Sequence, residues 1–545
     1  QGTLLLMAWV GVVALSIALV ACTCGAQVST IYSTSLAFAA KKTDGTVVVW
    51  GDVNNGGDAT VPNAVDLTGV DTIYSTGYAF AAKKIDGTVV VWGDGNSGGD
   101  ATSVDLTAVD SIYSTSVAFA AKKTDGTVVV WGNADNGGNA TSVNLTDVDT
   151  VYSTCCAFAA KKTDGTVVVW GDANKGGDAT VPNAVDLTDV DTIYSTNRAF
   201  AAKKTDGTVV TWGDPDVGLP PAAELTGVDT IYSTDRAFAA LKTNGNLVVW
   251  GMVDNGGDLS VPQLPDLSGV FDTIYSTGYA FALKKTDDTV VVWGNANNGG
   301  DATAVDLTGV DTVYSTNVAF AAKKTDGTVV VWGDANKGGD ATVPNAVDLT
   351  GVDTIYSTYS AFAAKKTDGT VVVWGHVNNG GDATVPNAVD LTGVNTIYST
   401  GYAFAALKTD GTVVAWGSAS YGGDATGVDF TITSTATTSS ATVTTTSATT
   451  STSSTTSSTS STSSTSSTSS TSSTSSTSSA TTSRSGTSTS TSQTSTSSTT
   501  SSTSSTSSTS STSSTSSTSS TSSATTSRSG TSTSTSQTST SSTTS

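Results

Sequence analysis

Apolar residues recur along the middle of the chain in a phrase that is repeated ten times with small changes. The phrase runs Thr-Ile-Tyr-Ser-Thr, two changing residues, Ala-Phe-Ala-Ala-Lys-Lys, Thr-Asp-Gly and Thr-Val-Val-Val-Trp-Gly. Its tryptophans lie 38 to 43 residues apart, at positions 50, 92, 131, 170, 212, 250, 293, 332, 374 and 416. A period of this length indicates a protein built from one repeated supersecondary unit.

A tight hairpin is predicted inside each unit. Asp44 and Gly45 separate two runs that are rich in strand-forming residues, and we expect both turn residues to take positive φ. Eight other units keep Asp-Gly or Asn-Gly at this place. The seventh unit has Asp287 and Asp288, which enter the left-handed region at some cost.

The remaining strands follow from the same pattern. Thr-Ile-Tyr-Ser-Thr predicts a strand before the hairpin, and Val-Asp-Leu-Thr predicts a short outer strand, so each unit is a three- or four-stranded antiparallel sheet without a helix. Residues 47–50 are apolar at successive positions, which predicts a central strand covered on both faces. Radial stacking would cover it in an all-β propeller of about ten short blades. An open β superhelix of the same units is the alternative.

The residues of the units also resemble a known family. Residues 403–417, followed by Tyr421, Gly422 and Gly423, resemble the regulator of chromosome condensation repeat. The short period and the Ala-Thr-Val-Pro segment are closer to the compact repeats of a secreted bacterial β-lactamase-inhibitor family. The resemblance implies a β-propeller whose turns form a protein-binding face. This chain departs from the family in having Gly-Gly-Asp in place of Gly-Gln-Leu-Gly and ten units in place of the usual seven.

Two adjacent positions between Tyr-Ser-Thr and Ala-Phe-Ala differ from unit to unit far more than their surroundings. Repetition places them on one face of the domain, where a rigid scaffold presents turns for binding. Tyr and Arg at such positions are the residue types that dominate binding hot spots. The predicted binding face comprises Leu36, Tyr78, Arg198, Arg236, Tyr279, Tyr359 and Tyr402. Unconstrained variation at exposed turns is the alternative.

The loop after each Trp-Gly has oxygen-bearing side chains at alternate positions and a glycine turn, like half of a calcium loop. The candidate calcium ligands are Asp52, Asn54, Asp58, Asp172, Asn174 and Asp178. The alternative is a turn that uses Asp for local backbone hydrogen bonds, and we expect no cofactor if it holds. Cys155 and Cys156 are adjacent, which allows a vicinal disulfide, a reactive thiol pair or an incidental pair at a variable turn.

Composition and charge exclude several classes of function. The chain has 24 basic and 46 acidic residues, a net charge of −22, which disfavours nucleic acid as a partner. His376 and Glu224 are the only residues of their types, so His-dependent triads and Glu-based acid/base pairs are excluded. We expect His376 to be solvated. The aspartates recur in every unit at turns, which a single active site would not require. An enzyme with Asp-based chemistry is therefore the least favoured hypothesis, and we predict that the protein is not an enzyme.

The two ends of the chain differ from its middle. Residues 1–27 are apolar and predict a cleaved signal peptide or an uncleaved signal anchor, the one route by which we expect a membrane contact. Residues 28–433 hold the repeats. Residues 434–545 are nearly all Ser and Thr, which predicts a disordered tail suited to O-glycosylation, with a plain linker as the alternative. Asn139 and Asn144 begin N-glycosylation sequons.

Together these features predict an exported recognition protein, secreted or held at the cell surface. The turns on one face of its propeller would bind a protein or a surface glycan, and the tail would serve as an O-glycosylated stalk. A structural surface or matrix glycoprotein that self-assembles into a coat or filament is the alternative.

Overall fold

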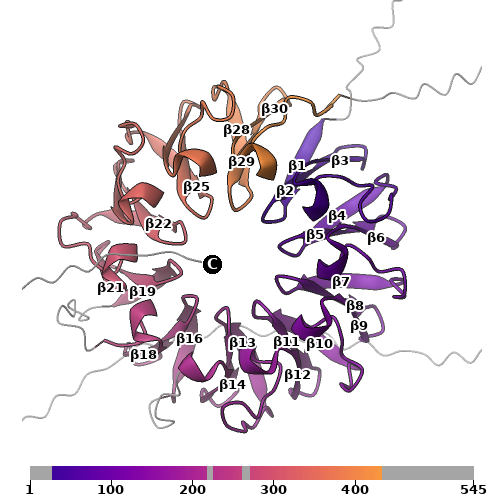
Figure 1. Cartoon of the computed structure of the whole chain (residues 1–545). Helices are drawn as coiled ribbons and strands as arrows, with labels where there is room; N and C mark the ends of the chain where they lie inside the picture. The colour runs from indigo at the N-terminus through magenta and orange to yellow at the C-terminus, as the bar shows by residue number, and fades with distance from the viewer. Residues whose placement is uncertain (1–26, 218–224, 260–269, 432–545) are drawn as a thin grey trace, which may run out of the picture. The chain divides into compact units, whose positions relative to one another are not determined.

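The structure is a computed structural model that describes residues 27–217, 225–259 and 270–431. In these residues the chain forms ten three-stranded antiparallel sheets, and each sheet is one blade (Figure 1). The predicted all-β class is confirmed. The predicted export segment, the Ser/Thr tail and Glu224 lie outside the described residues. The helices that are described are single 3-10 turns, and none of them is long and apolar enough to cross a membrane.

In each blade the first strand is innermost, the second is in the middle and the third is outermost. The inner strands are β1 (Val28–Ser33), β4 (Val70–Ser75), β7 (Val109–Ser114), β10 (Val148–Ser153), β13 (Val190–Ser195), β16 (Val228–Ser233), β19 (Phe271–Ser276), β22 (Val310–Ser315), β25 (Val352–Ser357) and β28 (Val394–Ser399). The middle strands are β2 (Ala37–Lys42), β5 (Ala79–Lys84), β8 (Ala118–Lys123), β11 (Ala157–Lys162), β14 (Ala199–Lys204), β17 (Ala237–Lys242), β20 (Ala280–Lys285), β23 (Ala319–Lys324), β26 (Ala361–Lys366) and β29 (Ala403–Lys408).

The outer strands are β3 (Val47–Gly51), β6 (Val89–Gly93), β9 (Val128–Gly132), β12 (Val167–Gly171), β15 (Val209–Gly213), β18 (Leu247–Gly251), β21 (Val290–Gly294), β24 (Val329–Gly333), β27 (Val371–Gly375) and β30 (Val413–Gly417). A 3-10 helix follows each outer strand: η1 (Val53–Asn55), η2 (Gly95–Ser97), η3 (Ala134–Asn136), η4 (Ala173–Lys175), η5 (Pro215–Val217), η7 (Val253–Asn255), η8 (Ala296–Asn298), η9 (Ala335–Lys337), η10 (Val377–Asn379) and η11 (Ala419–Tyr421).

The fully buried strand of each blade is the one that begins Ala-Phe-Ala. In β5 all four residues of Ala-Phe-Ala-Ala are 0% exposed, whereas the Val residues of β3 are half-buried. The prediction that residues 47–50 form the central strand was therefore wrong. Phe80 and Ala82 face the preceding blade, and Ala79 and Ala81 face the following one, so a large side chain always meets small ones across the interface.

Two features of the turns differ from the prediction, the φ of Asp44 and the Val-Asp-Leu-Thr segment, and one feature of the seventh blade agrees with it. At the first hairpin only Gly45 takes positive φ (79°), and Asp44 instead accepts hydrogen bonds from the Thr46 amide (2.9 Å) and hydroxyl (2.7 Å). In the seventh blade Asp288 does enter the left-handed region, with φ 62°. The Val-Asp-Leu-Thr segment forms no strand in the described blades, because its aspartate makes the same local turn with the threonine two residues later.

Neighbouring blades are joined by a loop that enters the core of the next blade. Phe80 and Trp92 stack with ring centroids 5.0 Å apart, and Trp92 Nε1 donates a buried hydrogen bond of 3.0 Å to the carbonyl of Gly56 in the preceding blade. Gly56 has φ 107°, and a Cβ there would lie 2.6 Å from the Phe80 ring. Only glycine fits this place, which explains the first glycine of the Gly-Gly that follows Trp-Gly in nine of the ten units.

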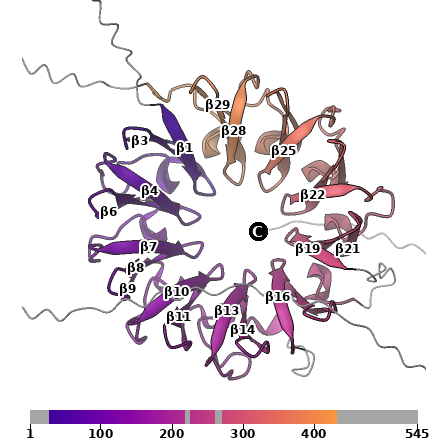
Figure 2. The ribbon, with the colours of Figure 1, turned by 180° about the vertical axis from the view of Figure 1, so that it is seen from behind.

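The same contact closes the ring. Trp50 Nε1 donates to the carbonyl of Gly422 (3.0 Å), and Phe430 lies edge-on to Trp50 with centroids 5.4 Å apart. Each inner strand contacts the inner strands of both neighbours, including β1 with β28 (Figure 2). The propeller therefore closes with ten blades, and the open superhelix is not formed.

We predict that Trp92→Phe destabilises the propeller by about 1–2 kcal/mol more than Trp250→Phe, because a buried hydrogen bond is lost and the Gly56 carbonyl is left unpaired. Trp250 stacks on Phe238 at the same 5.0 Å distance. Its Nε1, however, is buried without an acceptor among the described residues. Urea unfolding of the two variants measures the difference.

Trp250→Phe is the matched control, because both substitutions remove the same atoms from the same stacked pair. Equal losses in the two variants would show that the indole hydrogen bond contributes nothing to the contact between blades.

Candidate binding face

The end of each inner strand lines an axial cavity of about 820 Å³, to which all ten blades contribute. In the first blade the cavity is lined by Ser33, Thr34 and Ser35. Buried Thr34 accepts hydrogen bonds from the amides of Leu36 (3.1 Å) and Ala37 (2.9 Å), and its hydroxyl donates to the carbonyl of Asn55 (3.2 Å). This threonine thus ties the variable turn to the 3-10 loop, a role that the sequence analysis missed.

The first variable position of every blade takes part in a closed circuit of backbone hydrogen bonds. The Ser35 amide donates to the Gly77 carbonyl (3.0 Å), and the circuit returns when the Gly401 amide donates to the Ser35 carbonyl (3.0 Å). Because the circuit uses only main-chain groups, it holds the turns in place whatever side chains they carry. The ten positions are Ser35, Gly77, Ser116, Cys155, Asn197, Asp235, Gly278, Asn317, Tyr359 and Gly401.

All seven residues predicted for the binding face therefore lie at one end of the ring. Tyr359 is in the circuit itself, and the other six follow a circuit residue directly. Three of them, Tyr78, Tyr359 and Tyr402, form an aromatic group, and Arg198 and Arg236 form a charged group on other blades. Tyr279 lies in the blade after the charged group, and Leu36 belongs to neither group. Their binding role stays a prediction.

The aromatic group centres on Tyr402. Its ring lies edge-on to Tyr359 (centroids 5.5 Å apart) and tilted against Tyr421 (5.2 Å). Burial raises the pKa of Tyr402, and the nearby Tyr359, Tyr421 and Tyr78 raise it further. We call Tyr78, Tyr359, Tyr402 and Tyr421 the tyrosine arc. Tyr421 was not among the predicted residues, although its position holds Asn, Ser, Lys or Val in the other blades.

Tyr359 reaches across the tenth blade to the first. Its hydroxyl lies 3.1 Å from Ser35 Oγ, and a Cβ on Gly401 would collide with its ring. Even so, 47% of Tyr359 and 37% of Tyr78 are exposed. The arc therefore presents fixed aromatic surface to solvent.

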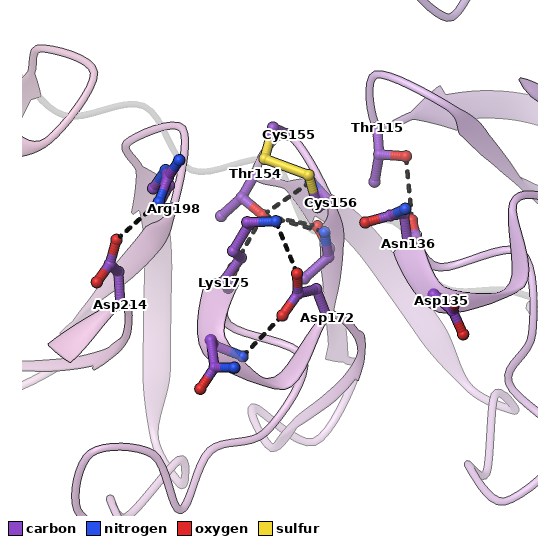
Figure 3. A network of polar contacts seen from close by, with 12 residues as sticks. Thr115, Asp135, Asn136, Thr154, Cys155, Cys156, Asp172, Lys175, Arg198 and Asp214 are labelled. Carbon is purple, nitrogen blue, oxygen red and sulfur yellow. Dashed lines mark hydrogen bonds and ion pairs between the residues drawn. A yellow bond between two sulfur atoms is a disulfide. The ribbon is translucent and has the colours of Figure 1, made fainter. Parts of the chain in front are cut away.

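The charged group lies in the fifth and sixth blades. Arg198 Nη1 is 3.5 Å from Asp214 Oδ2 (Figure 3). Arg236 Nη2 approaches the same oxygen from the next blade at 3.8 Å. Asp214 is only 8% exposed. Beside them Asp235 accepts a hydrogen bond of 2.7 Å from Asn197, and burial raises its pKa against the opposing effect of Arg236.

Cys155 and Cys156 form a disulfide at the turn of the fourth blade (Figure 3). Next to it Lys175 Nζ donates to Asp172 Oδ2 (2.7 Å). Burial acts to raise the pKa of Asp172, but the hydrogen bonds from Lys175 and the Asn174 amide outweigh it and lower the pKa.

The four aspartates among the candidate calcium ligands accept local hydrogen bonds, and Asn54 and Asn174 donate to two of them through their backbone amides. Asp52 Oδ1 accepts from the Asn54 amide (3.0 Å) and the Asn55 side chain (2.8 Å), and Asp58 Oδ1 accepts from the Thr60 amide and hydroxyl (both 2.8 Å). Asp172 and Asp178 make equivalent bonds. Within the described ranges no three His, Cys, Asp or Glu side chains gather as a metal site would require. Calcium binding stays a prediction.

Three further predicted residues are placed as follows. His376 is half-buried rather than solvated, and its Nδ1 has no hydrogen-bond partner in the part of the chain that is described. Asn139 and Asn144 are exposed on the outer loop of the third blade. Asn144 Oδ1 accepts from the Thr146 amide (3.2 Å) and hydroxyl (2.9 Å), the same turn that aspartate makes elsewhere. Glycosylation of both asparagines stays a prediction.

No protein-family model matches the chain, and no curated protein matches it in sequence. Solved structures with a similar fold include Prp20p of Saccharomyces cerevisiae (16% identity, 42% of this chain and 72% of that one, TM-score 0.29). They also include the ectodomain of the receptor kinase CR4 of Physcomitrella patens (12%, 48% and 70%, 0.29) and the computationally designed protein Ika8 (16%, 64% and 96%, 0.28). Prp20 is the yeast RCC1, a member of the family that the repeat resembles.

We predict that acid weakens the propeller through its outer aspartates. Hydrogen bonds from Lys366 and Thr350 lower the pKa of Asp348 from 3.8 to about 2. Its contribution to stability is therefore complete above pH 3.8 and is lost as the pH falls toward 2. Asp348→Asn should lower the melting temperature at pH 6 and make it less dependent on pH between 4 and 2.

The third blade supplies the control, because Asn144 already stands where other blades have this aspartate. Asn144→Ala should leave the acid dependence unchanged. An Asp348→Asn variant with the full acid dependence would contradict the assignment. Aspartates held in the same way are Asp66, Asp105, Asp186, Asp306 and Asp390.

Proposed function

We propose that this protein is a non-enzymatic recognition protein and that the tyrosine arc binds a protein partner. The observation that carries the proposal is the packing of Tyr402 against both Tyr359 and Tyr421, which leaves aromatic surface exposed in a fixed arrangement. Tyrosine gives large contact area at low entropic cost. The backbone circuit beneath the arc already holds the turns in one conformation. Less conformational entropy is then lost on binding, which favours affinity.

The state of the carboxylates supports a non-enzymatic role. Asp44, Asp58 and Asp66 each accept hydrogen bonds from the amide and hydroxyl of the threonine two residues later, and these bonds help to lower their pKa values. Lowered pKa values make poor general acids and weak bases near neutral pH. These aspartates therefore serve a structural purpose, because their carboxylates stabilise local turns.

The same proposal includes the place where the protein acts. An apolar leading segment, two exposed sequons and a tail of Ser and Thr support export, with the propeller displayed outside the cell on an O-glycosylated stalk.

We predict that Tyr78→Ala, Tyr359→Ala and Tyr402→Ala, combined in the full chain, reduce partner binding at least tenfold. Loss of several aromatic anchors removes hot-spot contacts while the backbone circuit stays intact. The partner is first identified by cross-linking the wild-type protein in its native surroundings. Its affinity for wild type and variant is then measured by surface plasmon resonance.

Val117→Ala is the matched control, because Val117 holds the position equivalent to Tyr78 and Tyr402 in the third blade and is not one of the arc tyrosines. Thermal unfolding of the triple variant should stay within a few degrees of wild type, since the replaced residues lie at the surface. Undiminished affinity in a folded triple variant would refute the proposal.

A further inference from the structure

The fifth, sixth and seventh blades surround a pocket of about 510 Å³ beside the axial cavity. The repeats depart from their common pattern here. The second variable position is Arg198 and Arg236 in two successive blades and arginine in no other, and Met252 replaces the usual Asp or Asn after the Trp-Gly. Because the blades are near copies, a cluster of departures around one hollow indicates a site with its own ligand.

The two arginines are held in place and keep donors to spare. Arg236 Nη1 contacts Met252 Sδ at 2.9 Å, and both guanidinium groups approach the buried Asp214. Each guanidinium carries five N–H donors. These fixed contacts use only a few of them, and both side chains line the pocket. A ligand therefore meets oriented hydrogen-bond donors.

The pocket also offers acceptors and an aromatic wall. Asp235 and Asp254 supply carboxylate oxygens at the lining. The amides of Asn197 and Asn255 lie beside them and donate to Asp235 and to the Gly278 carbonyl (2.8 Å). Asn298 and Tyr279 of the seventh blade also line the pocket. Planar amides, carboxylates and guanidinium groups around an aromatic ring supply the paired donors and acceptors that vicinal hydroxyl groups require.

Charge decides between a neutral and an anionic ligand. The two arginines are opposed by three carboxylates, Asp235 and Asp254 at the lining and Asp214 behind it, in a chain of net charge −22. An anionic ligand would face a net negative site. A neutral, hydroxyl-rich ligand satisfies the lining without that cost.

We propose that this pocket binds a short neutral oligosaccharide, with Arg198, Arg236, Asp235 and Asn298 bonding its hydroxyl groups and Tyr279 packing on a sugar ring. The volume lies within the range of about 300–1,000 Å³ that is typical of sites for small ligands. The inference rests on the proposed recognition role of this face and adds a second class of ligand to it.

The test uses the full chain and a panel of neutral trisaccharides of glucose, mannose, galactose, xylose and N-acetylglucosamine, measured by isothermal titration calorimetry. At least one trisaccharide should bind. Tyr279→Ala and Asn298→Ala should each lower the affinity for that trisaccharide about tenfold or more. Tyr78→Ala and Asn379→Ala change the equivalent positions in other blades and should leave its affinity unchanged.

Three results would overturn the inference: no binding of any neutral trisaccharide at millimolar concentration, equal effects of the pocket and control variants, or tighter binding of a uronate trisaccharide or an acidic peptide. The two sites can fail separately. The arc variant should keep sugar binding, and Tyr279→Ala should keep binding of the protein partner.

Discussion

The contact on which the structure depends is the one between successive blades, in which a glycine of one blade lies under the stacked Phe and Trp of the next. The Gly56 carbonyl accepts the indole hydrogen bond of Trp92, and a Cβ on Gly56 would lie 2.6 Å from the Phe80 ring. Each blade is therefore completed by its predecessor, and a blade without one exposes an aromatic pair. The segment that contains Gly422 and Phe430 covers the Phe and Trp of the first blade, so closure of the ring covers the last aromatic pair.

A ring held together in this way separates the scaffold from the residues that vary. The aromatic contacts lie in the core, and the circuit at the mouth uses only amides and carbonyls. The buried Thr34 fixes the turn from below. Side chains at the two variable positions therefore contribute little to holding the ring together, which is why glycine, cysteine, arginine and tyrosine all occur there in otherwise similar blades.

Local patterns in the sequence were sufficient for the three strands of each blade, the place of the hairpin and the common face of the variable turns, because these depend on neighbours within one unit. They wrongly predicted a fourth strand at Val-Asp-Leu-Thr. They were insufficient for contacts between units. The Trp92 to Gly56 bond joins residues 36 apart, and the Tyr359 to Ser35 contact joins residues 324 apart. The choice of middle strand failed for the same reason. Alanine has a low strand propensity, so one unit alone does not indicate that an alanine-rich segment is the middle strand. The small side chains are needed because the phenylalanine of the neighbouring blade packs against them.

The acidity of the chain has a structural origin. Nine of the ten repeats use Asp-x-Thr turns, such as Asp44 with Thr46 and Asp58 with Thr60, to end a strand or start a loop without a second element. Such turns hold 23 of the 46 acidic residues of the chain, so they supply half of its negative groups. That charge then acts on every ligand that approaches, because it excludes polyanions whatever the variable turns carry. The two adjacent arginines only offset this field locally, so shape, aromatic surface and neutral hydrogen bonding are left to determine what the face recognises.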